Sequence, residues 1–288
     1  MAAAFLVTLR EGLEAALIIG IILAYLDRTG GRQYFRNIWL GAGLAVMVSL
    51  AAGAGLYWTI GHLSGRAEEI FEGTAMFIAV LVLIYMVIWM KRQAVNIKAN
   101  LEAQVGSAVA TGSALTLASL AFIVVVREGI ETVLFMLGVL TSATPLGATV
   151  GGLLGLALAV GIGYGIYRGA SRINLRAFFN VTSLLLILFA AGLLAHGIHE
   201  FHEAGVIPPV VEHVWDVNHI LAEKTGFGKF LASIFGYNAN PSLVEAIAYF
   251  SFLGLALAGY FWPGTTKGAG KLSVEAEHAR AGSGGLES

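Results

Sequence analysis

The sequence predicts an all-α, polytopic membrane protein with seven transmembrane helices. Of its 288 residues, 57% are hydrophobic and only 12% are charged, and its mean hydropathy is +0.79. That composition excludes an ordinary soluble domain and makes a lipid bilayer the expected partner. Apolar runs of about 20 residues or more, long enough to cross a bilayer, lie at 2–26, 38–61, 70–90, 116–141, 145–168, 178–198 and 243–262.

The balance of charge and the absence of cysteine exclude several other classes of partner and site. The 17 basic and 18 acidic residues nearly cancel, so nothing indicates a nucleic-acid partner. The chain contains no cysteine, which rules out disulfides, thiolate metal sites and cysteine nucleophiles. The first run lacks a basic segment before it and carries charges inside it, so it is predicted to be a retained span and not a cleaved signal peptide.

Basic residues follow the first, third and fifth runs and so predict the orientation of the chain. By the positive-inside rule, the loops that carry them are cytoplasmic. This places the N-terminus outside and the C-terminus inside, and the Gly- and Ser-rich stretch 263–288 is then expected to be a disordered cytoplasmic tail. The basic residues are Arg28, Arg32, Arg36, Lys91, Arg92, Lys98, Arg168, Arg172 and Arg176.

A repeated charged motif divides the chain into two halves. Arg-Glu-Gly-Leu-Glu occupies 10–14 in the first run, and Arg-Glu-Gly-Ile-Glu occupies 127–131 in the fourth. The first run crosses inward and the fourth outward, so the two copies are expected to be antiparallel at similar depth. We therefore predict a 3+3 inverted repeat, an architecture typical of secondary transporters. Its parts are repeat one at about 1–92, repeat two at about 116–203, an outer segment at 204–241 and a seventh helix at 243–262, all within one domain at 1–262.

The charges in this motif need a partner. Each charge at mid-membrane costs roughly 2.5–3.5 kcal/mol on insertion scales, so six of them cost on the order of 15–20 kcal/mol if unpaired. Residues three and four apart share a helix face, but two Arg against four Glu still leave two negative charges in excess. Either some carboxylates are protonated or a cation lies among them, and the alternative is a pair of structural salt bridges. The candidate metal ligands are Glu11, Glu14, Glu128 and Glu131, with Arg10 and Arg127 tuning their charge.

Two further carboxylate pairs have the same spacing at the predicted outer face. Glu69 and Glu72 open the third run, and Glu200 and Glu203 follow the sixth. Solvated helix ends rich in Glu are common, but four such pairs in one chain suggest an outer metal-collecting site and then a passage. Imidazole could join the last pair as a ligand, although histidines at the end of a span are often simple interfacial residues; the candidates are His199 and His202, with His196 at the same spacing.

The sequence also predicts helical structure in two of the connecting segments. Glu212, Asp216, His219 and Glu223 recur at helical spacing and predict an amphipathic helix in the outer segment. Residues 91–110 predict a basic, partly helical connector near the anionic inner lipid surface.

Carboxylates without thiolates suit hard cations, and imidazole extends the choice to first-row transition metals. Three readings compete with metal import. A proton-coupled exchanger of another divalent metal, such as lead or manganese, would use the same carboxylates. A di-iron enzyme would need Glu-x-x-His motifs on facing helices, and only Glu275 and His278 in the tail have that spacing. A structural scaffold would bind no metal.

The doubled motif resembles the paired Arg-Glu-Gly-x-Glu signature of the oxidase-dependent iron permease family, which includes fungal high-affinity and bacterial iron-uptake permeases. The resemblance covers roughly 1–262, including Glu-Ile-Phe-Glu-Gly at 69–73 and His-Glu-Phe-His-Glu-Ala-Gly at 199–205. It implies an iron importer and no enzyme, with iron (Fe²⁺ or Fe³⁺) as transported substrate and no tightly bound cofactor. The four motif Glu would be transmembrane ligands, and the outer pairs an acquisition site. It also implies an oxidase or periplasmic iron-delivery partner and a multi-pass location in the bacterial inner membrane.

Overall fold

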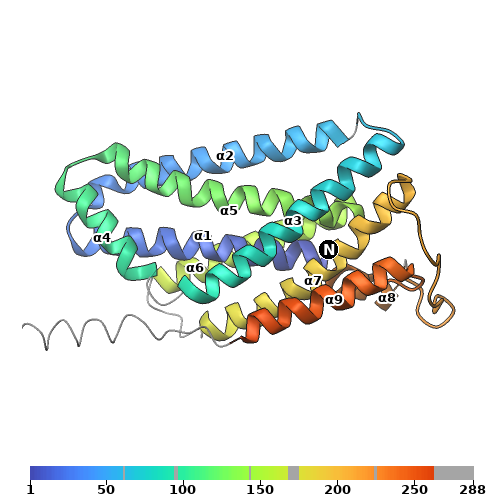
Figure 1. The fold of residues 1–288 in the computed structure, drawn as a ribbon. Coiled ribbons are helices and arrows are strands. Elements are labelled where there is room, and N and C mark those ends of the chain that lie inside the picture. Colours follow the sequence, from blue (N-terminus) through green and yellow to red (C-terminus); the bar gives the residue numbers. More distant parts are fainter. Residues whose placement is uncertain (61, 94–96, 143, 168–174, 224–225, 263–288) are drawn as a thin grey trace, which may run out of the picture.

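The computed structural model describes residues 1–60, 62–93, 97–142, 144–167, 175–223 and 226–262 (Figure 1). Within these ranges all regular secondary structure is helical. The predicted tail, with Glu275 and His278, lies outside the described residues, as do Arg168 and Arg172. The elements are α1 (Ala2–Arg28), the short 3₁₀ helix η1 (Arg32–Tyr34), α2 (Phe35–Ile60), α3 (Arg66–Gln93), α4 (Ile97–Ala110), α5 (Ala114–Ser142), α6 (Pro145–Tyr167), α7 (Leu175–Glu203), α8 (Gly226–Phe235) and α9 (Leu243–Phe261).

Each of the seven predicted apolar runs forms a helix whose bounds lie within a few residues of the prediction. Five helical stretches, those of α2, α3, α6, α7 and α9, are long and apolar enough to cross a membrane. The other two, α1 and α5, have 27 and 29 residues and contain the charged motifs. This is the architecture of a polytopic membrane protein. The predicted connector at 91–110 contains the helix α4.

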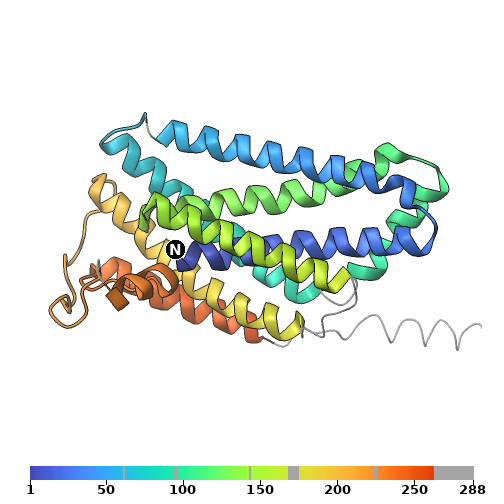
Figure 2. The ribbon, with the colours of Figure 1, turned by 180° about the vertical axis from the view of Figure 1, so that it is seen from behind.

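The helices lie roughly side by side and pair across the two halves of the sequence. The largest interfaces join α1 to α6, α2 to α5 and α3 to α7, and α1 and α5 run in opposite directions (Figure 1). The contact of α6 with α1 is visible from behind (Figure 2). There the hydroxyl of Thr8 donates to the carbonyl of Gly152 at 2.9 Å, and a Cβ on Gly155 would overlap the carbonyl of Phe5. Small residues thus allow the two backbones to approach closely.

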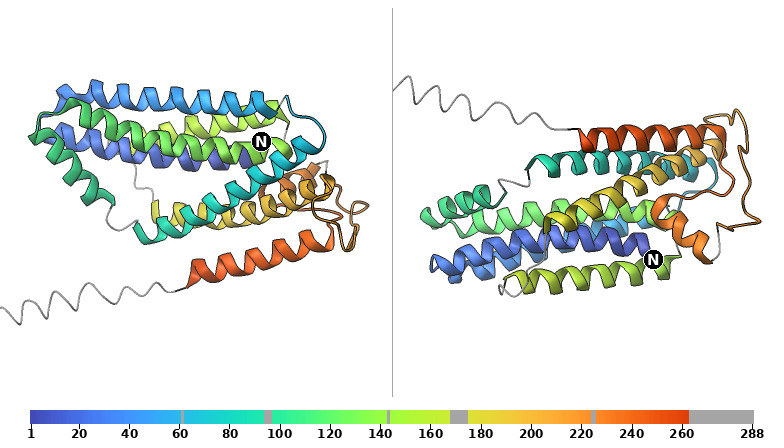
Figure 3. Two further views of the ribbon diagram at one scale, coloured as in Figure 1. Left: turned by 45° about the horizontal axis from the view of Figure 1, so that its top comes forward. Right: turned by 90° about the horizontal axis from the view of Figure 1, so that it is seen from below.

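Three apolar clusters form the interior, the smallest of which joins Leu9 and Leu13 of α1 to Ala159 of α6. The largest contains buried residues of α3, α5 and α7 such as Met76, Phe135 and Leu186, and another joins α1, α2, α4 and α5 around Leu26 and Ile38. Large apolar side chains on the outer faces of α2 and α6 are exposed, as expected of surfaces that contact lipid; they include Trp39, Leu44, Leu50, Leu146 and Leu153. The seventh long helix, α9, packs mainly on α7 (Figure 3).

The predicted amphipathic helix at 212–223 is wrong, because that segment is irregular. Its backbone pairs with the chain that precedes α9 instead, since the amides of Val214 and Val217 donate to the carbonyls of Pro241 and Ala239. The backbone amide of Asn218 and its side chain both donate to Asp216 Oδ1 at 3.0 Å, which lowers the pKa of that carboxyl. The nearby helix is α8, which the sequence analysis did not anticipate.

Candidate metal site

The first motif lies midway along α1, and its three charged residues are buried. Arg10 Nη1 donates to Oε1 of the adjacent Glu11 at 2.8 Å, and the i,i+4 spacing of the helix brings Arg10 Nη2 to 3.1 Å from Glu14 Oε1. The second contact is an ion pair without hydrogen-bond geometry. Because the Arg10 side chain is 0% exposed, its charge is balanced within the protein.

The second motif has the same internal pairing but a different environment. Arg127 Nη2 donates to Glu128 Oε1 at 2.7 Å, and Arg127 Nε lies 3.6 Å from Glu131 Oε1. The Arg127 side chain is 42% exposed, and its guanidinium lies over the ring of Trp89 on α3, 5.0 Å from the ring centroid. The two copies of the motif are therefore related in sequence but not equivalent in structure.

The two motifs meet between α1 and α5. Glu11, Glu128 and Glu131 each offer a carboxylate oxygen, and these three oxygens all lie within 4.8 Å of one another. The Oε2 atom of each of the three is buried and has no hydrogen-bond partner among the residues that the structure describes. Unpartnered buried carboxylate oxygens are costly, and several oxygen ligands converging on one point suit a hard cation. We call these three residues the central cluster.

Glu14, the fourth motif carboxylate, lies outside the central cluster. Its Oε1 faces Arg10 Nη2, and its side chain is buried. Glu14 therefore acts here as a counter-charge to Arg10, while Arg10 also holds Glu11.

The glycine of each motif packs against a helix of the opposite half. A Cβ added at Gly12 would lie 3.0 Å from Ala159 Cβ on α6, whereas a Cβ at Gly129 would overlap the side chain of Ser49 on α2. Ser49 itself donates to the carbonyl of Ala45 at 2.9 Å. The glycines thus let α2 and α6 cover the motifs closely.

The two outer carboxylate pairs lie at the same end of the helix pair formed by α3 and α7. The rings of Phe77 and Phe201 meet there at a centroid distance of 5.4 Å, and the charges of Glu69 and Glu72 act on Glu200. Among the described residues, the central cluster is the one group of three or more acidic or imidazole side chains within 4.8 Å. The outer carboxylates are therefore neighbours without being assembled around one point.

The predicted histidines contact a carboxylate that the sequence analysis missed. Glu245, in the first turn of α9, has its Oε1 3.2 Å from His199 Nδ1 and 3.5 Å from His202 Nδ1. The other histidine of the series, His196, lies 3.6 Å from Glu200. The one signal in the sequence was Ser242 three residues before Glu245, a capping-box pattern that indicates a helix start but no contact with α7.

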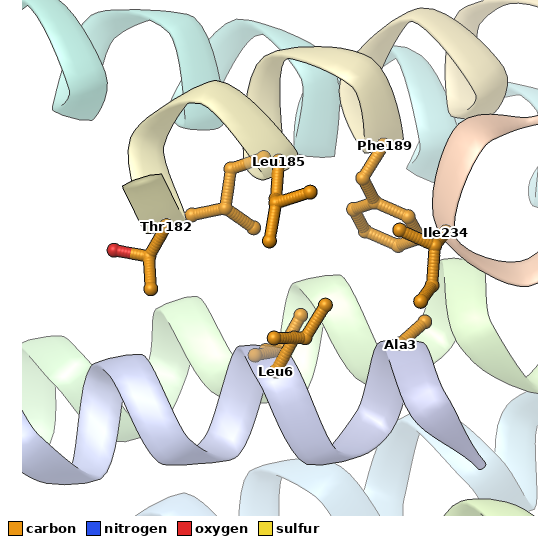
Figure 4. Close-up of a pocket in the computed structure, with 8 residues that line it drawn as sticks. Ala3, Leu6, Thr182, Leu185, Phe189 and Ile234 are labelled. Carbon is orange, nitrogen blue, oxygen red and sulfur yellow. The ribbon is translucent and has the colours of Figure 1, made fainter. Parts of the chain in front are cut away.

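A pocket lies apart from both charged sites, between α1, α7 and α8 (Figure 4). Ala3 and Leu6 face Leu185 and Phe189 across it, with Ile234 of α8 at one end. Thr182 is the polar residue of its lining. A lining with one hydroxyl among apolar side chains offers too few ligands for a cation.

Comparison with known proteins identifies the family. The family model described as "Iron permease FTR1 family" matches residues 1–263. The ferrous iron permease EfeU of Yersinia pestis is 37% identical over 261 residues, which cover 90% of this chain and 93% of that protein. The ferrous iron permeases EfeU of Escherichia coli O6:K15:H31 (strain 536 / UPEC) and Shigella sonnei (strain Ss046) are each 39% identical over 261 residues, covering 90% of this chain and 95% of theirs. No solved structure matches. The chain belongs to the iron permease FTR1 family.

Proposed function

We propose that this protein imports iron ions across a membrane and binds them in transit at the central cluster. The observation that carries the proposal is that the buried carboxylates of Glu11 and Glu128 and the half-buried carboxylate of Glu131 converge from two antiparallel helices, each with a buried oxygen that has no hydrogen-bond partner among the described residues. Relatives at 37–39% identity are named ferrous iron permeases, and the family model spans residues 1–263, the whole of the predicted domain. The protein acts as a transporter, with iron as its substrate.

Charge explains how the site holds and releases a metal ion. With all carboxylates ionised, the motif residues carry four negative and two positive charges, so a divalent cation neutralises the group. Arg10 and Arg127 orient the carboxylates through the contacts described above. They also reduce the excess negative charge of the site, so that the bound ion can still dissociate. Protonation of the carboxylates or competition from the guanidinium groups would lower the affinity on the inner side.

We further propose seven spans arranged as a 3+3 inverted repeat plus α9, with the N-terminus outside and the C-terminus inside. The pairing of α1 with α6, α2 with α5 and α3 with α7 supports this arrangement, because each half covers the charged helix of the other. Rocking of the halves about the central cluster would alternate access to it. Repeat one then spans about 1–92, repeat two about 116–203, and the outer segment 204–241.

In this orientation the outer carboxylates collect metal before it reaches the central cluster. Glu69, Glu72, Glu200 and Glu203, with His199 and His202, form that acquisition site. We place the protein in the bacterial inner membrane, where an oxidase or an iron-delivery protein would supply the ion from the periplasm.

The test is uptake of radiolabelled iron into liposomes that contain the purified protein. Glu131→Gln should abolish uptake because it removes one charge and one ligand from the central cluster, whereas Glu212→Gln, at an exposed carboxylate of the outer segment, should leave uptake unchanged. Uptake that survives Glu131→Gln at the wild-type rate would exclude the central role and favour a structural scaffold.

Metal selectivity needs its own measurement, because oxygen ligands alone do not separate iron from manganese. Each of Fe²⁺, Fe³⁺, Mn²⁺ and Pb²⁺ should be supplied in turn, either in the solution outside the liposomes or in their interior. Faster inward flux of iron supports an iron importer. Preferential flux of manganese or lead, or outward flux driven by a proton gradient, would support an exchanger of another divalent metal.

A further inference from the structure

The largest apolar cluster lies between the outer carboxylates and the central cluster. In the proposed orientation, the outer side of the central cluster lies toward the start of α1 and the end of α5. All buried members of the apolar cluster from α1 precede Glu11, and all those from α5 follow Glu131. Its buried members from α3 follow Glu72, and those from α7 precede Glu200. Four helices thus contribute apolar side chains to one layer on the outer side of the central cluster.

Phe135 is the largest apolar side chain of this layer that is fully buried. It is 0% exposed and lies four residues, about one helical turn, beyond Glu131 along α5. A Cβ added at Gly138 would overlap the side chain of Leu193 on α7, so α5 and α7 pack closely beside this ring. A packed apolar layer blocks a cation, because the ion would lose its water without gaining ligands.

The inner side of the central cluster is closed less completely. The apolar cluster around Leu26 and Ile38 lies there, and among the described residues it includes none from α3 or α7. The side chain of Arg127, at the inner edge of the second motif, is 42% exposed, and that of Glu131 is 13% exposed, whereas that of Glu11 is 1% exposed. Because exposure of a guanidinium to lipid is costly, the exposed part of Arg127 indicates a water-filled approach to the central cluster from this side.

We propose that Phe135 is the outer gate of the transport path, and that the structure is the state in which the path is closed to the outside and the central cluster is reached from the inside past Arg127. The proposal rests on the proposed function and names the side chain that alternating access has to move. For metal to pass from the outer carboxylates to Glu131, the ring of Phe135 must leave the layer between α5 and α7. While the ring stays in place, no water path joins the two groups of carboxylates.

The experiment measures how fast one cysteine is labelled from each side of the membrane, since the chain has no cysteine of its own. Ile130→Cys places a thiol beside the central cluster without removing a ligand, at a residue that is 44% exposed and three positions from Arg127 on the same helix face. A cationic, membrane-impermeant methanethiosulfonate reagent should label it at least about tenfold faster in inside-out vesicles than in spheroplasts. Adding Phe135→Ala should raise the rate in spheroplasts about tenfold or more. Labelling requires no iron flux, so this result and the iron-uptake result can fail separately.

Phe189→Ala is the matched control, because it removes the same ring from the same apolar cluster. Its position lines the pocket between α1, α7 and α8 (Figure 4), so it should leave the rate in spheroplasts unchanged. If Phe135→Ala does not accumulate, Phe135→Leu, which keeps an apolar side chain without the ring, should raise that rate in the same way. Equal or faster labelling of Ile130→Cys from the outside, no labelling from the inside, no effect of the Phe135 substitution, or an equal effect of Phe189→Ala would each overturn the proposal.

Discussion

Glu11 and Glu128 come from antiparallel helices, yet each offers a carboxylate oxygen within 4.8 Å of the other's. They occupy the same place in the two copies of the motif, so each copy keeps its own ion pairs while carboxylates of both copies meet in the central cluster. Close packing on α6 and α2 at Gly12 and Gly129 covers that site on both sides. Carboxylates from both copies of the motif therefore lie at one place between α1 and α5.

The four motif carboxylates should not be equivalent. Glu11→Gln should abolish metal binding at the central cluster because it removes a converging oxygen and its charge. Glu14→Gln should mainly lower the thermal stability, since breaking a buried ion pair costs about 3–5 kcal/mol and Glu14 faces Arg10. Calorimetric metal titration and thermal unfolding of both purified variants test this. Equal losses of metal affinity would contradict the assignment of Glu14 as a counter-charge.

The two arginines should differ in the same way. Arg10→Gln should sharply reduce the yield of folded protein, because it leaves Glu11 and Glu14 buried without their cation. The expected loss in the free energy of unfolding is about 3–5 kcal/mol. Arg127 is partly exposed and rests on Trp89, so Arg127→Gln should be milder, and Trp89→Leu should cost about 0.5–2 kcal/mol. The yield of monodisperse protein and its melting temperature report both effects. Trp89→Phe retains an aromatic face and serves as the control.

The contact between Gly129 and Ser49 predicts a rescue experiment. Gly129→Ala should destabilise the protein by about 1–3 kcal/mol, because the added methyl group overlaps the Ser49 side chain and forces α2 away. Ser49→Gly should restore stability and uptake in the double variant, since it provides the missing space. Gly254→Ala, where a Cβ meets nothing within 4 Å, should be neutral. Failure of the rescue would mean that Gly129 is needed for another reason.

Orientation in the membrane can be tested directly, because the chain contains no cysteine. Single cysteines placed at exposed positions should react with a membrane-impermeant maleimide according to the side on which they lie. Glu212→Cys in the outer segment should be labelled in intact spheroplasts, and Gln104→Cys in α4 should be labelled only after permeabilisation. The reverse pattern would invert the proposed topology.

The sequence by itself determined the seven long helices and the chemistry of the central cluster. The apolar runs end where charged or turn-forming residues begin, which is why the runs at 2–26 and 243–262 match α1 and α9 closely. The doubled motif specified the residue types of the site because a charge within such a run is expensive wherever the run folds. These properties are local and can be read in a single stretch of chain.

Only the tertiary structure decided which of these groups meet. The packing of α1 on α5 brings the carboxylates of Glu11, Glu128 and Glu131 together, whereas Glu14 lies against Arg10. The packing of α9 on α7 places Glu245 beside His199. The segment at 212–223 has the spacing of a helix, but its amides pair with residues just before α9 instead. A sequence pattern indicates which side chains share one face of a helix, whereas contacts between helices depend on packing among residues that lie far apart in the chain.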